Sequence, residues 1–137
     1  MKKILLPLLL ALPCITFASN FEMPISCELS PKDFFEPLIQ SQLLQPKPFK
    51  VVNSVNFFKL KPFKHVTVLG LPVESVYGFV QDQIMFIHSA NTPGELYGVA
   101  VKESIANVQA QLSANGITKA KINRINSELT TITCFGS

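Results

Sequence analysis

Residues 66–80, with the sequence VTVLGLPVESVYGFV, decide the fold of this chain of 137 residues. The stretch is rich in β-branched and aromatic residues, which predicts one long strand. Most of the odd-numbered residues from Leu69 to Phe79 are apolar, so the strand period of two places them together on a face that belongs to the core. Gly70 and Pro72 indicate a bulge or bend midway along the strand.

The residues that follow predict a hairpin partner for this strand. Residues 81–83 (QDQ) indicate a turn, and residues 84–89 predict a further strand. In a hairpin centred on this turn, the apolar residues of the two strands share one face. The predicted cross-strand pairs are Phe79 with Met85 and Tyr77 with Ile87.

The other face of the predicted hairpin is apolar too, because it carries Val76, Val80, Ile84 and Phe86. A sheet with one face in water would carry polar residues there. We therefore expect two helices, or a helix and a second layer of sheet, to cover both faces. If one face were left uncovered, it would form a binding surface for another protein.

A first helix is predicted from its capping residues. Ser30 is a suitable N-cap, with Pro31 at the first helical position and Asp33 in the first turn. The helix could continue to about Leu44. Pro37 is its weak point, because proline removes a backbone donor and could divide the helix.

A second helix is predicted to begin after Ser104 and to end near Gly116. Its apolar residues at helical spacing are Ile105, Val108 and Leu112. Further strands are predicted over residues 49–60, 96–102, 119–125 and 129–135. Together these elements predict an α+β fold with a mainly antiparallel sheet of about six strands and two helices, in the order α-β-β-β-β-α-β-β.

The first 18 residues resemble a secretory signal peptide, and residues 19–137 then form a single domain. Lys2 and Lys3 precede an apolar run over residues 4–17, and Ala18 suits the last position before a cleavage site. The run is shorter than the roughly 20 residues that a membrane-spanning helix needs, so we expect no stable membrane anchor. Leu and Pro before Cys14 disfavour a lipid-modification site. The predicted location is periplasmic or secreted.

Two cysteines, Cys27 and Cys134, remain after the predicted cleavage. An even pair in an exported protein predicts a disulfide. The loop that it closes is about 107 residues long, which the chain-entropy model values at about 4.7 kcal/mol. The competing interpretation is a reactive thiol, but neither cysteine has a neighbouring histidine or a helix start that would lower its pKa.

A basic segment is the candidate binding site. Five lysines and one histidine occur among the 19 residues from Lys47 to His65, with no acid, and phenylalanines separate them. Such a segment could attract an acidic protein, an anionic polymer or a membrane surface. The candidate partner-binding residues are Lys59, Lys61, Phe63 and Lys64. The alternative is that these lysines only protect a sheet edge and keep the protein soluble.

The sequence contains no motif for enzyme chemistry. His65 and His88 are the only histidines, and no nucleophile elbow, phosphate loop or carboxylate pair is present. We therefore expect no catalytic residues, no metal and no cofactor, although a small hydrolase is a less favoured alternative. Without the two lysines of the predicted signal peptide, 10 basic and 9 acidic side chains remain, so nucleic-acid binding is not expected either.

Two classes of function fit these features. The first is a small exported protein-binding protein, such as an inhibitor or immunity-type protein that acts on an envelope toxin or hydrolase. The second is an accessory or structural factor of an envelope or secretion assembly, in which the predicted hairpin would offer an edge for strand addition.

Overall fold

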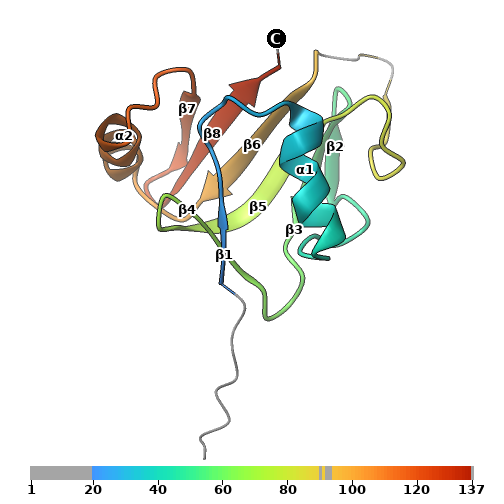
Figure 1. The fold of residues 1–137 in the computed structure, drawn as a ribbon, viewed down its shortest axis with the longest axis horizontal. Helices are drawn as coiled ribbons and strands as arrows, with labels where there is room; N and C mark the ends of the chain where they lie inside the picture. Colours follow the sequence, from blue (N-terminus) through green and yellow to red (C-terminus); the bar gives the residue numbers. More distant parts are fainter. Residues whose placement is uncertain (1–19, 90, 92–93, 137) are drawn as a thin grey trace, which may run out of the picture.

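A computed structural model describes residues 20–89, 91 and 94–136, and the predicted signal peptide lies outside them (Figure 1). The fold is α+β, with two helices and one eight-stranded, mostly antiparallel sheet instead of about six strands. In chain order the elements are β1 (Asn20–Met23), α1 (Pro31–Gln40), β2 (Lys50–Val52), β3 (Val55–Lys59), β4 (His65–Val68), β5 (Leu71–Phe79), β6 (Leu96–Val101), α2 (Ile105–Ala114), β7 (Lys121–Asn126) and β8 (Leu129–Phe135). No helix of the described part is long and apolar enough to cross a membrane.

Strand β5 is the centre of the sheet. On one side it pairs with β6, which continues to β8 and β7. On the other side it pairs with two strands: β4 at its beginning and β3 further along. β1 adds to β4 in the parallel direction, and β2 adds to β3. The sheet therefore forks along one side of β5, between β3 and β4.

The predicted single strand over residues 66–80 is wrong, because it is a tight hairpin of β4 and β5. The chain reverses at Leu69 and Gly70, whose φ angles are 51° and 74°. Two successive positive φ angles in a two-residue loop are typical of a type I′ turn, whose twist matches that of the flanking strands. The bend indicated by Gly70 is thus a complete reversal, and Val68 pairs with Leu71 across it.

The predicted strand over residues 49–60 is also two strands. β2 and β3 form a hairpin around Asn53 and Ser54, with φ angles of 48° and 65°. Asparagine is among the residues that adopt this left-handed conformation most readily, whereas serine there is less usual. The reversal was therefore weakly marked in the sequence.

Residues 84–89 form a loop and not a strand. Their backbone is held by a side chain, since Asn56 Nδ2 donates a hydrogen bond to the Ile87 carbonyl (2.9 Å) and Asn56 Oδ1 accepts one from the Ile87 amide (2.8 Å). Strand β5 pairs with β6 instead. The predicted pairs Phe79 with Met85 and Tyr77 with Ile87 are replaced by Phe79 with Leu96 and Tyr77 with Gly98.

The predicted helix starts are confirmed. Ser30 Oγ accepts a hydrogen bond from the Asp33 amide (3.1 Å), and Ser104 Oγ accepts one from the Asn107 amide (3.3 Å). Pro37 lies inside α1 without dividing it, and the helix ends at Gln40 instead of about Leu44. Strands β6 and β8 begin where the sequence predicts, and β8 matches its predicted bounds.

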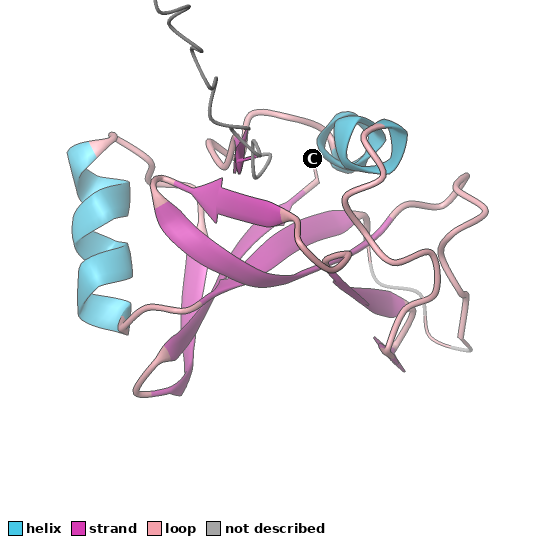
Figure 2. Ribbon diagram, turned by 90° about the horizontal axis from the view of Figure 1, so that it is seen from below, coloured by secondary structure: helices cyan, strands magenta, loops and turns pink. Residues whose placement is uncertain are grey.

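Both helices lie on the same side of the curved sheet (Figure 2). The ring of Phe34 in α1 stacks on Tyr97 at 4.2 Å between centroids, and α2 packs on β7 and β8. No helix of the described residues lies on the opposite face. Tyr77 is buried there because Phe57 stacks on its ring at 5.1 Å and its hydroxyl bonds to Thr133.

The prediction that two helices, or a helix and a second layer of sheet, cover both faces is therefore wrong. Both helices lie on one face, and within the described residues only side chains of the sheet itself shield the other. Val76, Val80 and Phe86 are buried in the core, so they do not form the alternative binding surface. Of that group only Ile84 is exposed.

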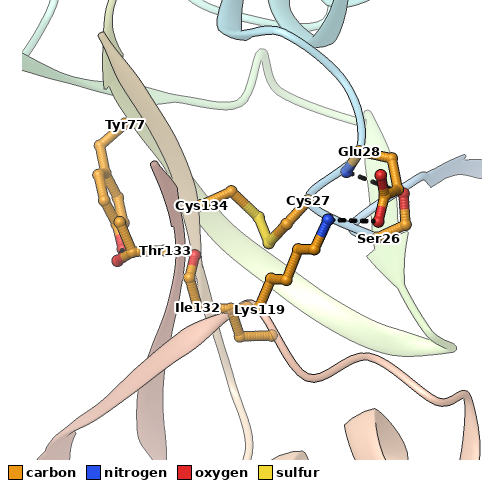
Figure 3. The surroundings of a disulfide bond; sticks show 8 residues. All are labelled: Ser26, Cys27, Glu28, Tyr77, Lys119, Ile132, Thr133 and Cys134. Carbon is orange, nitrogen blue, oxygen red and sulfur yellow. Dashed lines mark hydrogen bonds and ion pairs between the residues drawn. A yellow bond between two sulfur atoms is a disulfide. The ribbon is translucent and has the colours of Figure 1, made fainter. Parts of the chain in front are cut away.

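The predicted disulfide between Cys27 and Cys134 is confirmed (Figure 3). It joins the segment after β1 to β8, with a Cα–Cα distance of 5.1 Å. Thr133, the preceding residue of β8, points the other way, toward Tyr77. The cross-link therefore fixes the first described strand to the last one on the helix-covered side of the sheet.

Candidate protein-binding surface

The predicted partner-binding residues lie at the end of β3 and in the connection to β4. Lys59 is the last residue of β3, and the connection, residues 60–64, is here called the 60–64 loop. Its first residue, Leu60, forms an isolated bridge with Leu44. The Lys61 amide donates to the Leu43 carbonyl (2.8 Å). The loop is therefore attached to the segment that follows α1.

Residues 61–64 form a turn, because the Lys64 amide donates to the Lys61 carbonyl (3.2 Å). Pro62 and Phe63 are its central residues, and Phe63 has φ 64°. Proline followed by a positive φ is the pattern of a type II turn, in which glycine normally takes the second central position. A bulky residue there is uncommon and costs of order 1–2 kcal/mol.

The ring of Phe63 projects into solvent, with 93% of the residue exposed. Neither its backbone conformation nor its side chain contributes to the core. Strained and exposed residues of this kind are concentrated at functional sites. Phe63 is thus the residue of this loop that folding explains least.

The lysines of this surface have no acidic partner in the described chain. The one ion pair of the described chain joins Lys119 to Glu28 (3.2 Å), next to the disulfide (Figure 3). Lys61 and Lys64, which flank the exposed phenylalanine, are both free of carboxylate contacts within salt-bridge distance. The surface therefore presents positive charge that the described residues do not neutralise.

Two other lysines of the basic segment rest on aromatic rings. Lys59 Nζ lies 5.2 Å from the centre of the Phe49 ring, and Lys50 Nζ lies 5.4 Å from that of Phe57. These distances are in the range of cation–π contacts. The alternation of lysine and phenylalanine in the sequence therefore has a structural reason at these two pairs, and Lys50 lies on the edge strand β2 as the solubility interpretation expects.

An open pocket of about 530 Å³ lies at the fork of the sheet. Lys59 and Lys64 line it, whereas Lys61 and Phe63 do not. Lys102, directly after β6, is brought to the same pocket by the sheet topology. No local signal in the sequence indicates the position of Lys102 at this pocket. The remaining lining residues are Asn20, Leu60, His65, Val66, Thr67, Pro72, Val73 and Glu74.

A second open pocket, of about 610 Å³, has an apolar character. It lies between the segment after α1 and the loop that follows β5. Ile84 is fully exposed at this place, while Phe86 two residues later is buried. Its lining residues are Ile39, Pro46, Lys47, Pro48, Asp82, Gln83, Ile84, Met85 and Ile87. Sequence reasoning missed this pocket because it assigned the segment to a strand.

The perturbed titratable groups lie away from the 60–64 loop. Burial raises the pKa of Tyr77 and of Tyr97, both of which pack within the sheet and its core. Hydrogen bonds from Asn107 and from the Ser104 amide lower the pKa of Glu103 at the start of α2. In the described part of the chain, no three histidine, cysteine or acidic side chains are grouped so as to hold a metal ion.

Comparison with known proteins gives no relative from which a function could be transferred. No protein-family model matches the chain, and neither curated proteins nor solved structures show a significant match.

Proposed function

We propose that this protein is an exported protein-binding protein whose 60–64 loop contacts an acidic surface of its partner. The main support comes from Phe63. Its positive φ is a backbone conformation that glycine usually adopts, and its ring projects into solvent between Lys61 and Lys64. Buried aromatic residues at the centre of an interface supply much of the binding energy. The flanking lysines would attract the acidic partner and fix its orientation.

The anchoring of the loop supports this role. Hydrogen bonds from the Lys61 and Lys64 amides hold the turn, so Phe63 is presented in one backbone conformation before any partner arrives. A loop that is already ordered loses less conformational entropy on binding than a flexible one. The structure of the 60–64 loop is thus suited to tight recognition through a small contact area.

Export is the second part of the proposal. The signal-peptide pattern of residues 1–18 and the disulfide between Cys27 and Cys134 both fit an oxidising compartment, which for this chain means the periplasm or the exterior. A single small domain with an exposed aromatic anchor suits an inhibitor or immunity-type protein that blocks an envelope toxin or hydrolase.

A second candidate function is that of an accessory factor in an envelope or secretion assembly. Strand β7 favours it, because this six-residue strand pairs only with β8 within the described part of the sheet. Its free edge could accept a strand of another protein. Lys121 and Arg124 lie along this strand and are exposed.

Affinity capture from an envelope extract, with paired charge reversals, tests these candidates. In the first variant Lys61→Glu and Lys64→Glu act together, and in the matched control Lys121→Glu and Arg124→Glu reverse the same amount of charge on β7. Loss of one stoichiometric partner in the first variant alone supports the 60–64 loop. Loss in the β7 variant alone supports the strand-addition function and contradicts the proposal.

The aromatic anchor has its own test with the captured partner. Phe63→Ala should weaken binding about 30-fold or more, as expected for a central anchor. Phe135→Ala is the control, since Phe135 is exposed on β8. If the two variants bind equally well, Phe63 is not the anchor.

A further inference from the structure

The pocket at the fork of the sheet arises from an interruption in the strand pairing of β5. β4 pairs with Leu71 and Pro72 of β5, and pairing with β3 resumes at Ser75. In the described chain, Val73 and Glu74 therefore have no strand partner on this side of β5. A register irregularity between Val73 and Ser75 also interrupts the pairing with β6. Irregularities of this kind often lie beside functional sites, where they redirect side chains.

Positive side chains from separate parts of the chain line this opening. Lys59 comes from β3, Lys64 from the 60–64 loop and Lys102 directly follows β6, and His65 lies beside Lys64. Glu74 is the single acidic residue of the lining. None of the three lysines forms an ion pair with a described residue.

Like charges that line one pocket repel one another, and Glu74 is the only acid of this lining, although Lys102 also borders a neighbouring pocket lined by Glu74, Glu103 and Glu128. Lys102 is held in place by its backbone, because its amide donates to the Pro72 carbonyl (2.8 Å). The position of this lysine at the fork is thus a consequence of the β5–β6 pairing. An anion from outside would relieve the repulsion.

We propose that this pocket binds the carboxylate of an aspartate or glutamate side chain of the protein partner. The inference rests on the proposed function, since Lys64 belongs both to the pocket and to the loop that presents Phe63. A carboxylate is favoured over a phosphate because the lining contains no arginine and no helix N-terminus, which are preferred phosphate ligands. Glu74 also opposes a dianion more strongly than a monoanion.

The test uses the full disulfide-bonded protein and a glutamate tetrapeptide with blocked ends as the probe, followed by backbone NMR. The amide signals of Val66, Val73 and Lys102 should shift and saturate as the peptide is added. Lys102→Gln should weaken this binding about three- to fivefold, the range of an exposed ion pair. Lys32→Gln on α1 is the matched control and should leave the affinity unchanged.

Three outcomes would overturn the carboxylate site. They are shifts that do not saturate, shifts spread equally over distant lysines, and tighter binding of inorganic phosphate than of the peptide in a parallel titration. Equal affinity of the Lys102→Gln variant and the parent protein would also contradict it.

The pocket and the proposed function can fail separately, because Lys102 lies outside the 60–64 loop. If Phe63→Ala abolishes capture of the partner while Lys102→Gln changes neither peptide nor partner affinity, the protein-binding function stands and the carboxylate pocket is wrong. If the peptide binds at the pocket and no partner is captured, the pocket stands as an anion site and the proposed function is wrong.

Discussion

Two loops of this protein expose large apolar side chains, but they differ in what the rest of the loop does. The 60–64 loop exposes Phe63 and is held through backbone hydrogen bonds. The loop of residues 80–89, here called the 80–89 loop, exposes Ile84 and Ile87 yet buries Phe86 between the rings of Phe35 and Phe58, at 4.9 and 5.4 Å. The second loop is thus part of the core.

Polar contacts show the same difference. Asn56 and Ser54, both fully buried, bind the backbone of the 80–89 loop, and Ser54 Oγ accepts from the Ser89 amide (2.7 Å). The turn that presents Phe63 has no comparable side-chain contact in the described residues. Folding therefore accounts for the shape of the 80–89 loop, whereas the exposed and strained residue of the 60–64 loop calls for a functional reason.

The largest expected effect comes from removing the core residue of the 80–89 loop. Phe86→Ala should lower the free energy of unfolding by about 3–5 kcal/mol, because it leaves a cavity between α1 and the sheet. Ile84→Ala in the same loop should change it by less than about 0.5 kcal/mol. Denaturant unfolding of both variants measures the difference. A small effect of Phe86→Ala would show that this loop is not part of the core and would remove the contrast with the 60–64 loop.

A smaller loss of stability is expected when the polar contacts of the 80–89 loop are removed. Asn56→Ala should cost about 2–3 kcal/mol, since the amide and carbonyl of Ile87 lose their partner while part-buried. Asn123→Ala is the matched control, because Asn123 is also on a strand but is exposed. Hydrogen exchange should show faster exchange of the Ile87 and Ser89 amides in the first variant only. Unchanged protection of these amides would contradict the anchoring role of Asn56.

The elements that the sequence predicted well are those with local signals. Ser30 and Ser104 mark helix starts because a serine hydroxyl satisfies a free amide of the first turn, whatever the rest of the fold. The disulfide is different, because it joins residues 107 positions apart; its pairing was predictable because Cys27 and Cys134 are the only cysteines of the described chain.

The elements that it predicted wrongly depend on distant residues or on atypical turns. Ile84 and Phe86 would share one face of a strand, but in the observed loop Ile84 is exposed and Phe86 is buried. This loop conformation depends on Asn56 and Ser54, about 30 positions earlier, which bind its backbone. Leu69 adopts a left-handed backbone conformation in a turn, although leucine is not among the residues that indicate such a turn. The sequence of residues 66–80 therefore predicts one strand, although the residues form two.

Lys59, Lys61, Phe63 and Lys64 were selected from charge and aromatic content alone, and their role in binding stays a prediction. The structure places them at the end of β3 and in the connection to β4. Lys102 was not found, because its place at the fork follows from β6 pairing with β5 and has no local signal. The strain at Phe63 was likewise invisible until the turn geometry was known.

The smallest expected effect is an increase in the free energy of unfolding, and it tests the 60–64 loop directly. Phe63→Gly should raise the free energy of unfolding by about 0.5–1 kcal/mol, because glycine adopts the positive φ of this turn without the strain of a side chain. Phe63→Ala keeps the strain and should leave stability within about 0.5 kcal/mol of the parent. Denaturant unfolding separates the two variants, and both should bind the partner poorly because both lack the ring. A residue that lowers stability and is needed for binding fits a functional site. If Phe63→Gly is destabilising, the backbone of the turn is not strained and the case for Phe63 as a functional residue loses its main support.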